Sequence, residues 1–224
     1  MKTPKLEIAC FNLESALIAA KAGADRIELC LDFSSGGVTP DLETIRLARE
    51  QISVDLLVMI RPRGGNFIYN ATEFEAMKKS IAEIKRMNVN GFVFGILNND
   101  NTVNMQQNTE LTALAKPLSC TFHRAFDRVR DPLNALEDVI ACGFTTILTS
   151  GCETNAVDGI HVLVQLNEAA DGRITIMPGG GVRSSNLSLF REKIHLKYIH
   201  SSAIKANDLA DAEEIQLLKE KLRE

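Results

Sequence analysis

The stretch Leu118-Ser119-Cys120-Thr121-Phe122-His123-Arg124-Ala125-Phe126-Asp127 carries the pattern around which this 224-residue sequence is organised. A short β-type run after Pro117 ends in a histidine, an arginine and an aspartate, just before a helix expected near Pro132. Parallel α/β folds place their chemistry where a strand becomes a loop. The stretch therefore predicts a parallel sheet with a functional loop. The alternative is a solvated turn in which Arg124 and Asp127 pair with each other.

The same alternation of a strand and a helix repeats along the whole chain. Apolar periods and turn residues predict eight strands, each followed by a helix. The expected strands are Lys5–Cys10, Asp25–Cys30, Val54–Ile60, Gly91–Phe94, the opening stretch, Thr145–Leu148, Arg173–Met177 and Lys197–His200. The expected helices are Asn12–Ala22, Asp41–Gln51, Thr72–Met87, Met105–Ala115, Pro132–Ala141, Ala156–Ala169, Ser185–Lys193 and Ala212–Leu222. Because right-handed crossovers join parallel strands, eight such units close most naturally into a barrel.

We therefore predict an α/β fold, a single-domain (β/α)8 barrel of the TIM type over residues 1–224, with an open doubly wound sheet as the alternative. Helix-to-strand connections are short, as at Gly23, Gly143 and Gly172. Strand-to-helix connections are long, as at Leu31–Thr39 and Arg61–Ala71. Long loops at one end indicate a functional rim at the carboxyl ends of the strands.

Polar side chains gather at this rim. Glu28 and Cys30 lie two apart in one strand, so they face the same way, into the barrel if Ile27 and Leu29 face the helices. An unpaired ionised Glu inside a barrel is costly, so Glu7 and Glu28 need cationic partners. The candidate partners are Arg61, Arg63 and Arg124.

The rim residues permit an enzyme hypothesis. His123 is the candidate general acid or base, with Glu28 or Asp127 as its partner carboxylate. The candidate substrate-binding residues are Glu7, Arg61, Arg63, Arg124, Ser150, Gly179, Gly180 and His200. Backbone N–H groups of the Gly179–Gly181 run suit an anion, although a tight turn explains the run equally well. A closed ion-pair network is the alternative explanation for the charges.

Composition excludes several classes of protein. A net charge of −4 and the absence of Trp argue against nucleic-acid binding. No apolar run approaches the length of a membrane span, and the N-terminus lacks the features of a signal peptide, so we expect a cytoplasmic protein. Five cysteines without a CxxC pair argue against a disulfide framework or a structural zinc site. No organic cofactor is evident.

Six stretches resemble the CutC family, which is named for copper homeostasis. They are Ala22-Gly23-Ala24-Asp25-Arg26-Ile27-Glu28-Leu29-Cys30, Gly36-Gly37-Val38-Thr39-Pro40, Met59-Ile60-Arg61-Pro62-Arg63-Gly64-Gly65, Thr121-Phe122-His123-Arg124-Ala125-Phe126-Asp127, Leu148-Thr149-Ser150-Gly151 and Met177-Pro178-Gly179-Gly180-Gly181. They follow the order of the family and span most of the chain. The resemblance implies a TIM-type barrel, a cytoplasmic location and a homo-oligomer.

The resemblance also implies copper, as Cu(I) held by cysteines. Family members proposed to bind copper use one cysteine in strand one and one in strand two. Cys30 matches the second position, whereas the first falls on Ala9 in this sequence. Cys10 is one residue later and should face the opposite side of the strand.

Three hypotheses follow from the sequence. The first is a copper-homeostasis protein that binds copper through Cys30, with Cys10 as the other candidate ligand. The second is a TIM-barrel enzyme with lyase, isomerase or hydrolase chemistry on a small sugar-like or anionic substrate. The third is a scaffold without a site. We adopt the first from the family resemblance and keep the enzyme as its rival, because the rim chemistry suits a polar organic ligand.

Overall fold

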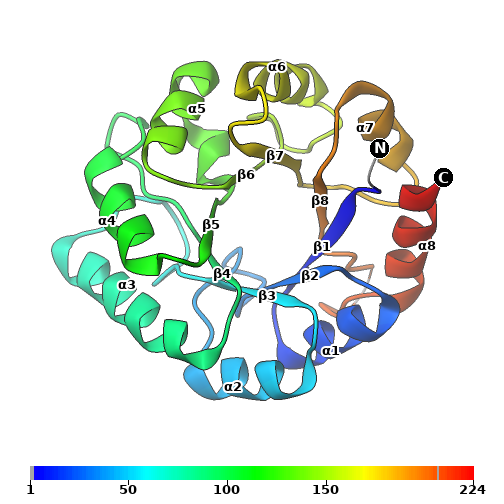
Figure 1. The fold of residues 1–224 in the computed structure, drawn as a ribbon, viewed down its shortest axis with the longest axis horizontal. Helices are drawn as coiled ribbons and strands as arrows, with labels where there is room; N and C mark the ends of the chain where they lie inside the picture. The colour runs from blue at the N-terminus through cyan, green and yellow to red at the C-terminus, as the bar shows by residue number, and fades with distance from the viewer. Residues whose placement is uncertain (1–2, 206) are drawn as a thin grey trace.

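Eight parallel strands form a barrel that eight helices surround in the computed structural model, which describes residues 3–205 and 207–224 (Figure 1). The strands are β1 Lys5–Cys10, β2 Arg26–Leu29, β3 Asp55–Met59, β4 Gly91–Phe94, β5 Ser119–Phe122, β6 Thr146–Thr149, β7 Thr175–Pro178 and β8 Tyr198–Ser201. The helices are α1 Leu13–Ala22, α2 Leu42–Gln51, α3 Ala71–Ile84, α4 Met105–Ala115, α5 Pro132–Ala141, α6 Ile160–Ala170, α7 Leu187–Lys193 and α8 Ala212–Arg223. Two short 3₁₀ helices are η1 Lys85–Met87 and η2 Arg124–Arg128.

The strand order confirms the predicted barrel. Hydrogen-bonded neighbours run β7-β6-β5-β4-β3-β2-β1-β8, and every paired ladder is parallel. Consecutive strands are therefore neighbours, and β1 lies between β2 and β8, which a doubly wound sheet does not allow. β7 and β8 lie side by side, but no ladder joins them among the described residues, so packing closes the last seam.

Local capping explains why the helices begin where they do. Asn12, the first residue of the predicted helix, is the N-cap of α1 and accepts a hydrogen bond from the Ser15 N–H, and Gly23 ends the helix in the left-handed region with φ of 100°. Asn70 and Glu73 form a capping box at the start of α3. These side chains satisfy backbone groups that the first turn leaves unpaired.

The largest difference between a predicted and an observed helix start is four residues, at α6. The sequence predicts a helix from Ala156, whereas α6 begins at Ile160. Before it, Gly159 packs so closely against the β6 loop that a Cβ atom would lie 1.8 Å from the Ser150 carbonyl oxygen. The chain bends to make this backbone contact, and the helix starts only after it.

Alternation along the strands divides their side chains between two layers. Leu6, Ile8 and Cys10 of β1 pack outward with the helices in the main hydrophobic core. Inside the barrel, Cys30, Leu57, Met59 and Val93 form a smaller apolar cluster. The carboxyl ends of the strands hold Glu28, His123 and His200, whereas Arg26 lies deeper, near the amino ends of the strands, against the Tyr198 ring.

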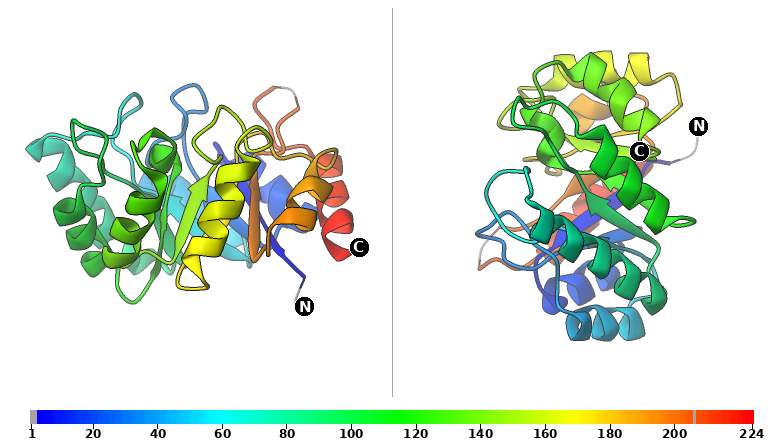
Figure 2. Two further views of the ribbon diagram at one scale, coloured as in Figure 1. Left: turned by 90° about the horizontal axis from the view of Figure 1, so that it is seen from above. Right: turned by 90° about the vertical axis from the view of Figure 1, so that its left-hand side faces the viewer.

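Long loops surround that end of the barrel, as predicted. Strand-to-helix connections occupy residues 30–41 after β2 and 60–70 after β3, and both stand on the same end of the barrel (Figure 2). Among the described residues, none of the helices is long and apolar enough to cross a membrane. The loops and the strand ends below them form the mouth of the barrel.

Candidate functional site

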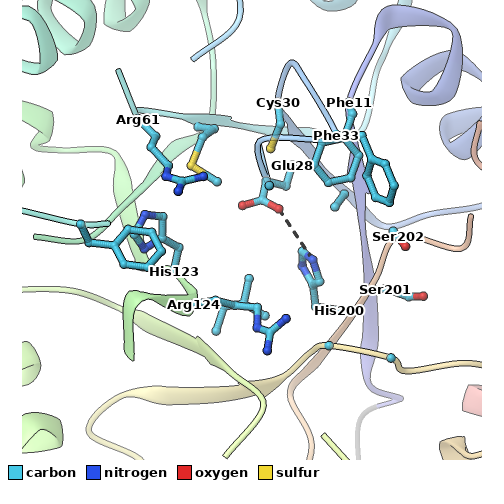
Figure 3. Close-up of a pocket in the computed structure, with 17 residues that line it drawn as sticks. Phe11, Glu28, Cys30, Phe33, Arg61, His123, Arg124, His200, Ser201 and Ser202 are labelled. Atoms are coloured by element: carbon cyan, nitrogen blue, oxygen red, sulfur yellow. Dashed lines mark ion pairs between the residues drawn. The ribbon is translucent and has the colours of Figure 1, made fainter. Parts of the chain in front are cut away.

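A cavity of about 290 Å³ opens at the mouth (Figure 3). It lies over the ends of the strands, and its walls combine charged, aromatic and sulfur-containing side chains. The lining residues are Ala9, Phe11, Glu28, Cys30, Phe33, Gly36, Met59, Arg61, Phe67, His123, Arg124, Leu148, Gly180, Gly181, His200, Ser201 and Ser202. The predicted orientation of Glu28 and Cys30 toward the barrel interior is therefore confirmed.

One side of the site is a buried network from β1, β2 and β8, which we call the acidic wall: Glu7, Arg26, Glu28 and His200. Arg26 Nε donates to Glu7 Oε2, and the other Glu7 oxygen lies 2.8 Å from His200 Nδ1. His200 Nε2 lies 3.7 Å from Glu28 Oε2 (Figure 3). All four residues are less than a tenth exposed, so their charges are compensated inside the protein rather than by solvent.

The two carboxylates of the acidic wall differ in their preference for a proton. Burial favours the protonated form of Glu7, but Arg26 and His200 outweigh it and lower the Glu7 pKa. Burial raises the Glu28 pKa to about 7, because Glu28 has no hydrogen-bonding cation of its own. Burial opposes charge on His200 as well, yet its hydrogen bond to Glu7 and the charge of Glu28 raise the His200 pKa.

The opposite side consists of His123 and its neighbours Arg61 and Phe67. We call it the neutral wall, after the uncharged imidazole of His123. The His123 ring lies 4.8 Å from the Phe67 ring, and its Nδ1 accepts a hydrogen bond of 3.3 Å from the Ala125 N–H. Burial, reinforced by the Arg61 charge, lowers the His123 pKa to about 3. The imidazole is therefore neutral near pH 7, with its proton on Nε2, which is buried and has no partner among the described residues.

The arginines of the mouth hold loops together. Arg61 donates through Nη1 to the carbonyl oxygens of Ser35 and Gly37, at 2.8 and 2.9 Å, and through Nη2 to that of Gly65 at 2.9 Å. It thus ties the β2–α2 loop to the β3–α3 loop. Arg63 lies outside the cavity lining, where it pairs with Glu73. The arginines were the expected partners of Glu7 and Glu28, but that expectation is wrong.

Asp127 organises the loop after β6. Its carboxylate accepts hydrogen bonds from the Thr149 hydroxyl, from the N–H groups of Ser150 and Cys152, and from Arg124 Nε at 2.7 Å. The pairing of Arg124 with Asp127 is the alternative that the sequence left open. Within the described residues, this carboxylate does not line the cavity, and its contacts place it as a support for the loop.

Other predicted rim residues are divided between the cavity and its surroundings. Gly180 lines the cavity and packs under the Arg124 guanidinium, where a Cβ atom would lie 3.1 Å from Arg124 Cζ. Gly179 packs against the Leu148 side chain, where a Cβ atom would lie 2.4 Å from Leu148 Cδ1. The Ser150 hydroxyl accepts a hydrogen bond of 2.9 Å from Arg124 Nη2. Gly179 and Ser150 thus support the site from behind.

The two predicted cysteine ligands face opposite sides of the sheet. Cys30 lines the cavity in the cluster that also holds Met59, whereas Cys10 packs outward and its Sγ lies 3.7 Å from the Ile8 carbonyl oxygen. The expected opposite orientation of Cys10 is confirmed. Burial and the nearby Glu28 carboxylate raise the pKa of the Cys30 thiol well above its usual range.

Sequence reasoning missed Arg26 and the aromatic part of the mouth. Arg26 lies two residues before Glu28 in the same strand, so the period of two already placed it on the interior face. Phe11, Phe33 and Phe67 line the cavity from loops and strand ends, where no periodicity indicates a direction. The Phe11 and Phe33 rings meet edge to face at 4.9 Å.

Known proteins share both the sequence and the architecture. The family model described as the CutC family matches residues 4–205. The copper homeostasis protein cutC homolog of Homo sapiens is 41% identical over 203 residues, which make up 91% of this chain and 74% of that protein. The crystal structure of CutC from Streptococcus agalactiae matches with a TM-score of 0.84 and 32% identity, covering 89% of this chain and 98% of that one. Phosphoribosyl anthranilate isomerase from Thermotoga maritima, 13% identical with a TM-score of 0.66 over 98% of each chain, shares the fold alone.

Proposed function

This chain belongs to the CutC family, and we propose that it serves copper homeostasis by binding Cu(I) through Cys30 in the barrel mouth. The observation that carries the proposal is that the thiol of Cys30 and the thioether of Met59 belong to one cluster on the cavity wall. Thiolate and thioether sulfur are the soft ligands that Cu(I) prefers. The five free cysteines suit the reducing cytoplasm in which we place the protein.

A site of this kind uses one thiolate rather than two. Cys10 lies on the outer face of β1 among the helices, so it cannot join Cys30 without a rearrangement of the strand. Met59 supplies the second soft donor, and the imidazoles of His123 and His200 line the same cavity. Because the Cys30 pKa is raised, Cu(I) has to displace the thiol proton, and affinity should increase with pH.

An anaerobic Cu(I) titration against a strong competing chelator tests this proposal. Wild-type protein is expected to take up one Cu(I) that Cys30→Ser cannot hold and that Met59→Leu holds more weakly. Cys10→Ser is the matched control, because it removes a buried cysteine outside the cavity and should leave binding unchanged. Weak binding that all cysteine variants share would contradict the proposal.

A second candidate function is an enzyme acting on a small sugar-like or anionic substrate. Its specific support is that Glu28 Oε1 and His123 Nε2 are both buried without a hydrogen-bond partner among the described residues, on opposite sides of one cavity. Native proteins seldom leave such atoms unpaired, so a ligand that bonds to both fits the site. Glu28, with a pKa of about 7, would exchange the proton, while the neutral His123 donates from Nε2.

The enzyme hypothesis calls for a different experiment. Phosphorylated and acidic sugars would be screened for binding and conversion by wild-type protein, His123→Gln and Asp127→Asn. Loss of His123 should abolish turnover while the fold is retained. Turnover that survives in His123→Gln would exclude this role, and loss in Asp127→Asn with an intact fold would show that the β6 loop contributes.

A further inference from the structure

The acidic wall contains a second set of metal-binding atoms, distinct from the sulfur atoms of Cys30 and Met59. Glu7, Glu28 and His200 each offer one ligand atom, and these atoms lie within 4.8 Å of one another. They come from three neighbouring strands, β1, β2 and β8, and all three residues are buried. We propose that Glu28 and His200 bind a divalent cation of the borderline class, such as Zn²⁺, Co²⁺ or Fe²⁺, through carboxylate oxygen and imidazole nitrogen, while Glu7 orients His200.

Glu7 prepares His200 as a ligand. The Glu7 Oε1 atom lies 2.8 Å from His200 Nδ1 and accepts a hydrogen bond from its N–H, which leaves the Nε2 lone pair directed toward Glu28. A carboxylate that holds the other nitrogen of a metal-binding histidine is the usual second contact of such sites, because it fixes the tautomer and the ring orientation. Arg26 balances the Glu7 charge, so Glu7 can hold His200 without needing the cation for itself.

The spacing of the first two ligands suits a single ion. His200 Nε2 and Glu28 Oε2 are 3.7 Å apart. Bonds from zinc to nitrogen and oxygen are about 2.0–2.2 Å long, so one ion between these atoms reaches both. The adjoining cavity of about 290 Å³ leaves room for water or a ligand oxygen in the remaining coordination positions.

The Glu28 carboxylate supplies an independent indication of a ligand. Glu28 is 3% exposed, and no hydrogen bond reaches its side chain within the part of the chain that the structure describes. Its Oε1 atom is fully buried, in a residue that lines the cavity (Figure 3). A buried carboxylate oxygen without a donor is costly, and a cation removes that cost directly.

This inference goes beyond the proposed function, because it concerns different donor atoms and a different class of cation. The ion would lie on the acidic wall, across the cavity from the neutral His123. From there it would polarise an oxygen atom of a bound ligand as a Lewis acid. Cys30 takes no part in the site, so the two metal preferences can be separated by substitution.

Titration of the metal-stripped protein with Co²⁺, followed by visible absorption and calorimetry, tests the proposal. Wild type is expected to bind one Co²⁺ with the absorption bands of nitrogen and oxygen ligands. Glu28→Gln and His200→Gln should each abolish saturable binding, and Glu7→Gln should weaken it about tenfold to a hundredfold, as expected for a residue that orients a ligand. His161→Gln, which changes an exposed histidine on α6 outside the cavity lining, is the matched control and should bind as wild type does.

The outcomes separate this site from the copper site. Cys30→Ser should retain Co²⁺ binding even if it loses Cu(I), and no sulfur-to-cobalt charge-transfer band should appear. The absence of saturable binding at millimolar Co²⁺ would overturn the proposal, as would unchanged affinity in folded Glu28→Gln and His200→Gln proteins. Circular dichroism establishes folding of each variant. If Glu28→Gln does not fold, Glu28→Asp retains the charge and should bind Co²⁺ with reduced affinity.

Discussion

Glu28 of the acidic wall and His123 of the neutral wall are almost equally buried, yet burial shifts their pKa values in opposite directions. Glu28 is 3% exposed and His123 is 4% exposed. Burial raises the pKa of the carboxyl group and lowers that of the imidazole, so both groups tend to be uncharged near pH 7. His200 is also buried, but two carboxylates face it and raise its pKa. The comparison shows that burial by itself favours the neutral form of a titratable side chain, and that the carboxylates facing His200 reverse this preference.

The largest expected effect comes from removing Arg26, whose guanidinium group pairs with Glu7 in the acidic wall. Arg26→Ala leaves the buried Glu7 carboxylate without its partner, which should lower the free energy of unfolding by about 3–5 kcal/mol. Urea unfolding of wild type and Arg26→Ala measures this loss. The double variant Arg26→Met with Glu7→Gln should recover much of it, since no charge is then left unpaired. An equal loss in the double variant would show that packing of Arg26 against Tyr198 matters more than charge.

On the neutral wall, the corresponding test is Arg61. Arg61→Met removes the charged donor of three carbonyl oxygens and should cost about 3 kcal/mol. It should also speed proteolysis within residues 30–41, because that loop loses its tie to the β3–α3 loop. Arg63→Met is the matched control, since the bonds of Arg63 to Glu73 and to the carbonyl oxygens of Gly64, Asn66 and Ile68 all stay within residues 64–73. It should leave proteolysis within residues 30–41 unchanged and cost less stability, because the pair with Glu73 is partly exposed. Similar losses in the two variants would contradict the role of Arg61 as the tie.

A third test compares the pH dependence of the two walls. His123 stays neutral in the fold down to a pKa of about 3, so the stability it contributes is lost as pH falls from its ordinary pKa of 6.5. Glu28 keeps its proton up to a pKa of about 7, so its contribution is present below its ordinary pKa of 4.5 and is lost as pH rises through 7. For each group, the slope of the free energy of unfolding against pH approaches about 1.4 kcal/mol per pH unit.

The two substitutions should therefore change the stability profile in opposite directions. Between pH 4.5 and 6.5, His123→Gln should remove an increase of stability with pH, and Glu28→Gln should remove a decrease. Urea unfolding of both variants at several pH values in this window provides the measurement. Slopes that change in the same direction would mean that the two walls titrate as one network.

The smallest expected effect concerns the aromatic rings on the two sides of the mouth. Phe33 is 43% exposed, so Phe33→Ala should change stability by less than about 0.5 kcal/mol. Phe67 packs between His123 and the Arg61 guanidinium, with ring and charge each 4.8 Å from its centroid, so Phe67→Ala should cost more. Thermal unfolding of both variants compares them. A larger loss for Phe33→Ala would reveal that the β2–α2 loop is anchored by its ring.

The period of the apolar residues and the positions of the turn residues were sufficient to predict the barrel, because strands and helices depend on local sequence patterns. Lys5–Cys10, Gly91–Phe94, Met105–Ala115 and Pro132–Ala141 coincide with the predicted elements, and other boundaries shift by a few residues. The interior positions of Glu28 and Cys30 also followed from the period of two. The partners of the charged residues did not, since pairing in a barrel depends on which strands are neighbours and on their register. Arg26 contacts Glu7 across β1 and β2, whereas Arg61 and Arg63 turn to loop carbonyls and to Glu73.

The hydrogen bond between Glu7 and His200 joins residues 193 positions apart. Synthesis runs from the N-terminus, so Glu7 and Arg26 leave the ribosome long before their imidazole partner exists. Until β8 has been made, β1 has an unpaired edge on the side that β8 later covers. The acidic wall is therefore completed at the end of translation, when the last strand docks. A nascent chain that stops before His200 can carry most of the barrel, but it cannot carry the finished site.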